Sequence, residues 1–223
     1  MCGRYLLEPR TPEAVRQFFE VDGAAALEPR WNLAPTQEAW VLRSRPDGAR
    51  ELAWLRWGLV PSWSKDASAA ARMINARSET ASVKPSFRAA WKARRCVVPA
   101  TGWYEWQAHA GRKQPWCLRL AGATFTAFAG LWERWQPAAG AAYESFTILT
   151  APAVPALADV HDRMPVVLPR DRIAAWLAAG AEAALPDAEE LGALAWERFP
   201  VSTRVNSPRH DDAACAEPLT GGP

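Results

Sequence analysis

The pattern of hydrophobic and polar residues predicts more strands than helices. Short apolar runs bounded by Gly, Pro or polar turn residues are typical of strands. Such runs occupy residues 38–43, 51–57, 95–99, 102–107, 116–120, 124–130, 145–150 and 164–168. The first two runs flank the sequence SRPDGAR, which predicts a hairpin, and the preceding segment 28–37 has the composition of a turn.

Helical patterns are fewer and do not alternate regularly with the strands. The first helix is predicted from Thr11, a capping residue, to Gly23, with Val15, Phe18 and Phe19 on one face. Further helices are predicted at residues 85–92, 170–180 and 186–196. This order predicts an α+β fold with a mostly antiparallel, barrel-like sheet flanked by helices. One domain over residues 2–210 is expected, followed by a loose C-terminal tail at residues 211–223.

Composition excludes several classes of protein. Hydrophobic residues make up 49% of the chain and charged residues 22%, as in ordinary globular proteins. No apolar run is long enough to span a bilayer and no signal peptide is evident, so a cytoplasmic protein without a membrane partner is expected. Four cysteines without C-x-x-C spacing predict reduced thiols, no metal and no cofactor. The net charge of +2 does not by itself indicate nucleic-acid binding.

The segment MINARSE contains a candidate binding pair. In extended backbone Asn75 and Arg77 point to the same side, whereas Ile74 and Ala76 point to the other. An amide offers a donor and an acceptor to a carbonyl or hydroxyl group, and a guanidinium binds phosphate through two N–H groups. An Asn that caps a turn beside a solvated Arg is the alternative interpretation.

The aromatic segment TGWYEWQ contains a candidate acid–base residue. By strand alternation Glu105 shares a face with Trp103 and Gln107, while Tyr104 and Trp106 face the other way. Loss of hydration among aromatic rings raises the pKa of a carboxyl group and suits it to proton transfer near neutral pH. A glutamate at a strand edge that reaches solvent would give the same pattern.

The segment VHDRMPVVL places His161 and Arg163 two residues apart, before an apolar run. Histidine titrates near neutrality and is the usual proton shuttle in enzymes. A structural histidine bonded to a backbone carbonyl is the alternative interpretation, and Asp162 is expected to cap a turn.

The remaining candidate is Cys2. If Met1 is removed, Cys2 carries a free thiol and a free α-amine, whose pKa of about 7.7–8.0 leaves part of it neutral. The amine can condense with an aldehyde to an imine, and the thiol can then close a five-membered thiazolidine ring. A second-position cysteine that only packs is the alternative, and Cys96 and Cys117 are expected to be core residues.

Together these motifs resemble the SOS response-associated peptidase family, also called abasic-site processing proteins. The similarity runs in order from Cys2 to about Leu168. It rests on the segments MCGRY, RWNLAPTQ, RWGLVPSWSKD, MINARSET, KPSFR, RRCVVPATGWYEW, FAGLWE and HDRMPVVL, with a fainter match in FPVSTRVN. The resemblance implies the bifurcated sheet of that family.

The resemblance also implies a function. A monomer would bind abasic sites in single-stranded DNA, including junctions with duplex DNA, and trap the sugar aldehyde on Cys2 as a thiazolidine crosslink during the damage response. Asn75 would position the sugar or the amine, Glu105 would move protons during imine formation and its reversal, and His161 would protonate the sugar oxygen. Strand cleavage by a lyase reaction, crosslink reversal and removal of Met1 by a peptidase reaction are implied side activities.

The family's DNA contacts correspond to further positions in this chain. Arg4, Arg77 and Arg163 match phosphate contacts, and Pro35 and Trp63 match a wedge that stacks against bases. Trp106 and Thr150 match other DNA-binding positions, although the sequence APAVP after Thr150 departs from the family pattern.

Two other functions stay open at this point. In a thiol peptidase, Cys2 would attack an amide bond. In a noncatalytic single-strand binding module, Trp and Arg side chains would act alone, without need of an acid–base pair.

Overall fold

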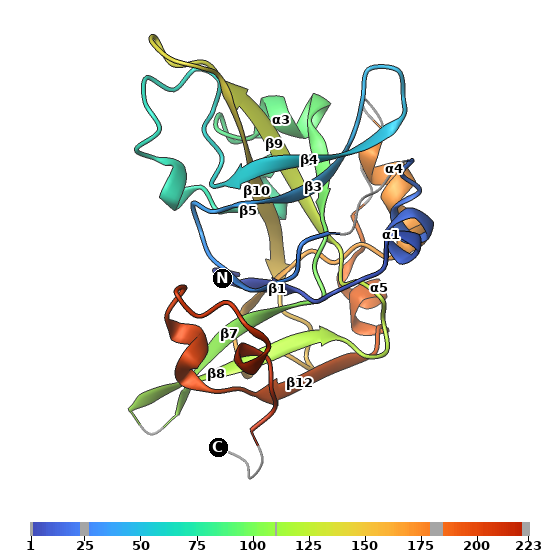
Figure 1. The fold of residues 1–223 in the computed structure, drawn as a ribbon, viewed down its shortest axis with the longest axis vertical. Coiled ribbons are helices and arrows are strands. Elements are labelled where there is room, and N and C mark those ends of the chain that lie inside the picture. The colour runs from blue at the N-terminus through green and yellow to red at the C-terminus, as the bar shows by residue number, and fades with distance from the viewer. Residues whose placement is uncertain (1, 23–26, 110, 179–184, 220–223) are drawn as a thin grey trace.

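The chain forms two β-sheets with short helices around them (Figure 1). The computed structural model describes residues 2–22, 27–109, 111–178 and 185–219. No helix in these ranges is long and apolar enough to cross a membrane.

The larger sheet contains a closed ring of five strands. The order is β10–β4–β3–β6–β9, and β9 pairs again with β10. These strands are β3 (Glu38–Ser44), β4 (Arg50–Trp57), β6 (Arg95–Val98), β9 (Phe128–Trp135) and β10 (Tyr143–Pro152). Neighbours are antiparallel except for β4 and β10. The predicted α+β fold with a mostly antiparallel barrel is confirmed, and the predicted hairpin is the β3–β4 pair.

Strand β10 extends beyond the ring and holds two further strands. On one side, β5 (Asn75–Arg77) pairs in parallel with residues 148–150. On the other side, β11 (Arg163–Pro165) pairs antiparallel with residues 150–152. The sheet therefore branches at β10, and this branch brings two segments far apart in the sequence to one strand.

The second sheet has the order β12–β8–β7–β1–β2 and is antiparallel in the described residues. Its strands are β1 (Tyr5–Leu7), β2 (Arg30–Leu33), β7 (Gly102–His109), β8 (Arg112–Leu120) and β12 (Trp196–Pro200). In Figure 1, β1 lies between the barrel strands and the β7–β8 pair. The segment before β1 is therefore held where the two sheets meet.

Both faces of the barrel strands are buried, because side chains that alternate along each strand pack into two different clusters. One face of the barrel packs against helices, as Leu42, Val97 and Leu131 lie in one cluster with Phe19 and Trp176. The opposite face packs against the second sheet. That cluster includes Cys2, Tyr5, Trp57, Cys96, Trp103, Phe128 and Phe146. The far face of the second sheet is covered by the C-terminal segment in a cluster that includes Leu6, Tyr104, Cys117, Val205 and Cys215.

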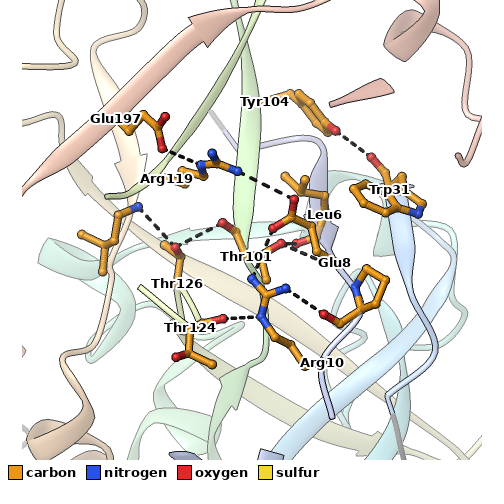
Figure 2. Close-up of polar contacts among 12 residues, drawn as sticks. Leu6, Glu8, Arg10, Trp31, Thr101, Tyr104, Arg119, Thr124, Thr126 and Glu197 are labelled. Atoms are coloured by element: carbon orange, nitrogen blue, oxygen red, sulfur yellow. Dashed lines mark hydrogen bonds and ion pairs between the residues drawn. The ribbon is translucent and has the colours of Figure 1, made fainter. Parts of the chain in front are cut away.

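A polar network fixes the end of β1 on the second sheet (Figure 2). Arg119 donates to Glu197 at 2.7 Å and lies 3.7 Å from Glu8. The backbone N–H of Glu8 donates to the Thr101 hydroxyl at 2.9 Å, and Thr126 donates to the Thr101 carbonyl at 3.3 Å. Because these contacts join β1 to β7, β8 and β12, they also restrain the residues that precede β1.

The first helix begins where the sequence predicts and ends earlier. Thr11 caps α1 (Pro12–Phe19). The helix ends at Phe19 because Glu20 adopts the left-handed conformation with φ of 52°. The predicted end at Gly23 is therefore wrong, and Gly23 lies outside the described residues.

The other three predicted helices are present but shorter. They are α3 (Arg88–Ala93), α4 (Ile173–Leu177) and α5 (Ala188–Gly192). A 3-10 turn at residues 170–172 precedes α4, and the predicted end of that helix lies outside the described residues. Helix α5 ends at Gly192 and β12 begins at Trp196, so about half of the residues predicted as the last helix are not helical. A short helix that the pattern did not predict, α2 (Ser78–Ala81), follows β5.

Several short strands escaped the sequence pattern. Strand β2 lies inside the segment predicted as a turn, and β12 begins at the last residue of a segment predicted as a helix. The run at residues 124–130 is a strand only from Phe128 onward, and the run at 164–168 pairs as a strand only through Pro165. Strands of three to five residues are too short to show a periodic pattern of hydrophobic and polar residues. Their formation therefore depends on the strands with which they pair.

Residues 211–219 pack against the second sheet, and the predicted loose tail is wrong for this segment. Asp211 accepts hydrogen bonds from the backbone N–H groups of Trp31 at 2.5 Å and Asn32 at 2.9 Å. It also pairs with Arg30 at 2.5 Å. One carboxylate therefore satisfies three donors of β2, an arrangement without a periodic signal in the sequence.

We predict that Asp211→Ala lowers the free energy of unfolding by roughly 1–3 kcal/mol, because three donors lose a charged acceptor. Urea denaturation followed by tryptophan fluorescence measures this change. The control is Asp212→Ala, which removes an exposed pair with Arg204 and should have little effect. Equal effects of the two substitutions would contradict an anchoring role for Asp211.

Candidate active site

Cys2 lies at the junction of the two sheets and its side chain is fully buried. It belongs to the same cluster as Tyr5, Trp57 and Trp103. The carbonyl oxygen of Cys2 accepts a hydrogen bond from Nδ2 of Asn75 at 2.7 Å. The backbone of Cys2 is therefore tied directly to the branch strand β5.

Asn75 offers an unused acceptor beside Cys2. Its Oδ1 atom is buried and has no hydrogen-bond partner among the described residues. A buried acceptor without a donor costs free energy that an incoming N–H or O–H group can recover. Ala76 is buried on the opposite face and Arg77 is exposed, so the predicted shared side of Asn75 and Arg77 is confirmed.

Glu105 is a buried carboxyl group, 3% exposed, in the middle of β7. Burial raises its pKa to about 7, against an opposing effect from the chain's positive amino terminus. Trp103 packs in the cluster of Cys2, whereas Tyr104 and Trp106 pack in the cluster on the other face of the sheet. The predicted alternation is confirmed, and the alternative of a solvent-exposed glutamate is wrong.

Glu105 and His161 line one open pocket of about 490 Å³. The other lining residues are Trp106, Lys113 and Asn206. A carboxyl group and an imidazole from distant parts of the sequence thus face the same space. The aromatic ring and the lysine offer a stacking surface and a positive charge for an anionic ligand.

His161 is held as a neutral imidazole. Burial and the chain's amino terminus lower its pKa, although Asp162 acts in the opposite direction. Its Nδ1 atom accepts a hydrogen bond from the backbone N–H of Arg163 at 2.9 Å. The neutral ring therefore carries its proton on Nε2, which makes Nε2–H a donor at the pocket.

One contact conflicts with this tautomer. Oδ1 of Asp162 lies 2.8 Å from Nδ1 of His161, a distance that suits a protonated Nδ1. The side chain of Asp162 is 86% exposed and can turn into solvent, whereas the N–H of Arg163 is fixed by the backbone. We therefore assign the proton to Nε2, with the Asp162 pair forming only when the ring is doubly protonated.

The thiol of Cys2 is protonated at neutral pH. Burial raises its pKa well above the usual value, and the negative charge of Glu105 acts in the same direction. A thiolate is the stronger nucleophile, so this thiol is a poor first attacker. Cys96, Cys117 and Cys215 are also buried, as predicted for the first two.

Arg4 lies beside the pocket but is partly committed. Its Nη1 atom donates to Oδ1 of Asn32 and to the carbonyl of Val205, each at 2.7 Å. Its guanidinium carbon is 5.9 Å from the ring centroid of Trp106. The Nη2 atom makes no hydrogen bond within the described residues and is left for a ligand.

Arg163 and Thr150 are joined to each other. Thr150 is fully buried, and its carbonyl accepts from Nη2 of Arg163 at 2.5 Å. The same guanidinium makes two hydrogen bonds with Glu79, at 2.5 and 3.0 Å. Thr150 is therefore inaccessible, and Nε of Arg163 is the guanidinium nitrogen left without a partner among the described residues. Arg77 is exposed and makes no polar side-chain contact within the described residues.

The two residues predicted as a stacking wedge lie on turns outside the pocket lining. Pro35 is half-buried in the turn between β2 and β3, next to Thr36, whose φ is 70°. Trp63 is 64% exposed, and the adjacent Ser64 carbonyl accepts from Nε1 of Trp135 at 2.7 Å. A tryptophan this exposed on an anchored turn is available for stacking.

Sequence reasoning missed several residues that build the site. Asn32 is fully buried and, besides binding Arg4, donates to the carbonyl of His210 at 2.7 Å. Asn206 accepts from Nε1 of Trp106 at 2.7 Å. Asn32, Glu79 and Asn206 lie in the segments RWNLAPTQ, MINARSET and FPVSTRVN, whose family match was the available signal. Lys113 gave none, because an isolated charge on a strand is usually a solvated residue.

Comparison with known proteins adds independent findings. Residues 1–208 match the family model described as SOS response associated peptidase. The chain is 36% identical to Abasic site processing protein YoaM of Bacillus subtilis, over 96% of both chains. It is 33% identical to Abasic site processing protein HMCES of Gallus gallus, over 87% of this chain and 67% of that protein.

Solved structures match the fold over nearly the whole chain. A Bacteroides thetaiotaomicron protein of 23% identity has a TM-score of 0.78 and covers 98% of this chain and 100% of its own. A Bordetella bronchiseptica protein of 28% identity has a TM-score of 0.73 and covers 90% of this chain and 100% of its own. The two-sheet arrangement is therefore shared with both.

We predict that Glu105→Gln stabilises the protein more at pH 8 than at pH 5. The folded-state pKa of about 7 lies above the usual 4.5, so the folded state binds the extra proton and loses stability as pH rises between these values. The difference between variant and wild type should grow by up to about 3 kcal/mol across that window. Urea denaturation at both pH values measures it.

The control is Glu28→Gln at an exposed position. Glu105→Gln should show the larger change with pH of the two variants. A pH-independent difference for Glu105→Gln would contradict a raised pKa at this site.

Proposed function

Because the chain belongs to the SOS response-associated peptidase family, we propose that it processes abasic sites in single-stranded DNA by linking the sugar covalently to Cys2. One observation carries the proposal: Asn75 donates a hydrogen bond to the backbone carbonyl of Cys2. The negative charge of Glu105 also raises the pKa of the Cys2 thiol. Glu105 in turn shares a pocket with His161. A packing cysteine would need none of these groups.

The first step uses the amine that removal of Met1 exposes on Cys2. The neutral amine attacks the aldehyde carbon of the ring-opened sugar, and a C–N bond forms. The aldehyde oxygen gains protons and leaves as water, which gives an imine. Glu105 has a pKa of about 7, so it exists in both protonation states at neutral pH and can supply and remove these protons.

The second step closes the ring. The Cys2 thiol adds to the imine carbon through a new C–S bond, and its proton passes to the nitrogen. The sum is aldehyde plus aminothiol to thiazolidine plus one water, without any oxidant. Because burial keeps the thiol protonated, attack by the amine precedes attack by sulfur. The imine stage also permits strand cleavage by β-elimination, which rapid thiol capture suppresses.

His161 acts before either step, since an abasic sugar is mainly a closed ring. As the ring opens, the hydroxyl proton leaves and the ring oxygen gains a proton. The doubly protonated form of His161, with Nδ1 paired to Asp162, would donate its Nε2 proton to that oxygen, and the neutral ring that results would take up the hydroxyl proton. The unused Oδ1 of Asn75 would accept from the amine or a sugar hydroxyl.

Local positive charge, rather than net charge, would hold the DNA strand. Arg77 is exposed, Nη2 of Arg4 is available and Lys113 lines the pocket. Action as a monomer stays a prediction. A preference for junctions with duplex DNA stays a prediction.

We predict that the protein without Met1 forms a denaturant-resistant adduct with an oligonucleotide that carries one abasic site. Cys2→Ala should abolish the adduct because the sulfur is lost, and the α-amine that remains can form only an imine, which water hydrolyses. Cys117→Ala, at a cysteine on the far face of the second sheet, is the control and should retain it. Denaturing gels and intact mass measure the product.

An adduct that persists in Cys2→Ala would contradict the assignment of Cys2. Peptide cleavage without any adduct would favour the thiol peptidase instead, and binding without an adduct would favour the noncatalytic module.

We predict that His161→Gln slows crosslinking to a natural abasic site at least about tenfold, because general acid catalysis typically contributes more than that. An oligonucleotide with an acyclic aldehyde linker, which cannot close a sugar ring, should react at the same rate with variant and wild type. Single-turnover rates with both substrates measure the difference. Equal slowing on both substrates would contradict a role in ring opening.

A further inference from the structure

Glu105 and Trp106 point to opposite faces of the second sheet, yet both line the candidate site. The pairing of β1 with β7 explains this arrangement. The N–H of Tyr104 donates to the carbonyl of Arg4 at 2.9 Å, and β1 pairs with no later residue of β7 within the described parts of the chain. The pocket therefore lies at the edge of β7, where side chains from both faces reach it.

The segment that follows β12 completes the wall on the Trp106 side. It forms a 3-10 turn at Thr203–Asn206, whose buried Val205 lies in the same cluster as Tyr104. In Figure 1 this segment, near the red end of the colour scale, runs beside the β7–β8 pair. Asn206 ends the turn and lines the pocket. Two residues that lie 100 positions apart in the sequence, Trp106 and Asn206, therefore border one space.

One hydrogen bond fixes the orientation of the Asn206 amide. Nε1 of Trp106 lies 2.7 Å from Oδ1 of Asn206. An indole N–H can only donate, so the atom that faces it must be the amide oxygen. The Nδ2 atom, with its two N–H donors, is turned the other way and makes no hydrogen bond within the described residues. Because Asn206 is exposed, these donors are available to a ligand.

The same turn also holds Arg4. The carbonyl of Val205, one residue before Asn206, accepts from Nη1 of Arg4 at 2.7 Å. Oδ1 of Asn32 accepts from the same nitrogen at 2.7 Å, and Nδ2 of Asn32 donates to the carbonyl of Val205 at 3.2 Å. The guanidinium carbon of Arg4 is 5.9 Å from the ring centroid of Trp106. The turn therefore fixes a cation, an aromatic ring and an amide along one side of the pocket.

These three groups together suit one nucleotide of a DNA strand. An aromatic ring stacks against any base, and a guanidinium binds phosphate. Amide N–H groups commonly donate to phosphate oxygens in protein–DNA interfaces. Asn206 is bonded to the ring and follows the residue that binds the cation, so its Nδ2 lies beside both.

We propose that Asn206 is a DNA-binding residue. Its Oδ1 holds the indole of Trp106 in place, and its Nδ2 donates to a phosphate oxygen of the nucleotide next to the abasic sugar. This inference rests on the function proposed above. It gives the segment after β12 a part in substrate binding, beyond its packing against the second sheet.

Two substitutions separate the two atoms of the amide. Asn206→Asp keeps an oxygen that accepts from Trp106 but replaces the donor by an oxygen of a negatively charged group. Asn206→Ala removes both atoms. For each variant, the noncovalent Kd for single-stranded DNA with one abasic site is measured in a Cys2→Ala background. The crosslinking rate at saturating DNA is measured in the active protein.

Asn206→Ala should raise the Kd at least about threefold, because a hydrogen bond to a charged group is lost. Asn206→Asp should raise it at least about tenfold, because a carboxylate would face a phosphate. This additional loss should shrink at high salt, which screens the repulsion. The rate at saturating DNA should stay within about threefold of wild type, since the lost contact acts on binding.

A double-mutant cycle tests the bond to Trp106. Trp106→Phe keeps an aromatic ring for stacking but has no N–H to donate. Asn206→Ala should weaken binding less in the Trp106→Phe background than in the Cys2→Ala protein alone, because part of its effect is the position of the indole. Equal effects in the two backgrounds would contradict a positioning role for Oδ1.

Thr203→Asp is the matched control, because it adds the same charge to the same turn at an exposed position outside the pocket lining. It should weaken binding less than Asn206→Asp. Thermal unfolding separates binding from folding. Asn206 is exposed, so its substitution should shift the Tm by less than about 4 °C.

Three outcomes would overturn the inference. A wild-type Kd in Asn206→Ala would show that the amide does not contact DNA. Equal weakening by Asn206→Asp and Thr203→Asp would reduce the effect to charge repulsion. A Tm lowered enough to account for the lost binding would make Asn206 a structural residue. If the wild-type protein forms no adduct, the proposed function fails instead, whereas the Kd measurements still test Asn206, so the two failures are distinct.

Discussion

The pairing of β10 with four other strands is the constraint on which the rest of the structure depends. Along one part of its length β10 closes the barrel with β4 and β9, and beyond it the same strand holds β5 and β11. Asn75 on β5 and His161, just before β11, are therefore held in fixed positions beside β10. Cys2 and Glu105 arrive from the second sheet, so the site forms where the two sheets pack together.

Burial controls the protonation of this site. It raises the pKa of Glu105 to about 7, raises that of the Cys2 thiol and lowers that of His161. Each shift favours the neutral form, because a poorly hydrated site disfavours charge. A neutral thiol, a neutral imidazole and a carboxyl group that can both give and take protons suit condensation chemistry better than a thiolate-first attack on an amide.

Sequence patterns predicted the parts of the molecule that repeat locally. The β3–β4 hairpin, the cap at Thr11 and the shared face of Asn75 and Arg77 follow from turn residues and strand alternation. The family motifs then indicated the candidate residues, four of which the structure joins through contacts or a common pocket. Contacts between distant charges were not predictable, because neither the Glu79–Arg163 pair nor the Asp211 anchor has a local signature.

The most direct test of the account is the chemical structure of the adduct. After reaction with abasic single-stranded DNA and digestion, mass spectrometry should locate the sugar remnant on an N-terminal peptide that begins with Cys2. Its mass should show the loss of one water, and the thiol should resist alkylation after denaturation because sulfur is part of the ring. An adduct that leaves the Cys2 thiol open to alkylation, or a borohydride-trapped adduct on Lys113, would contradict it.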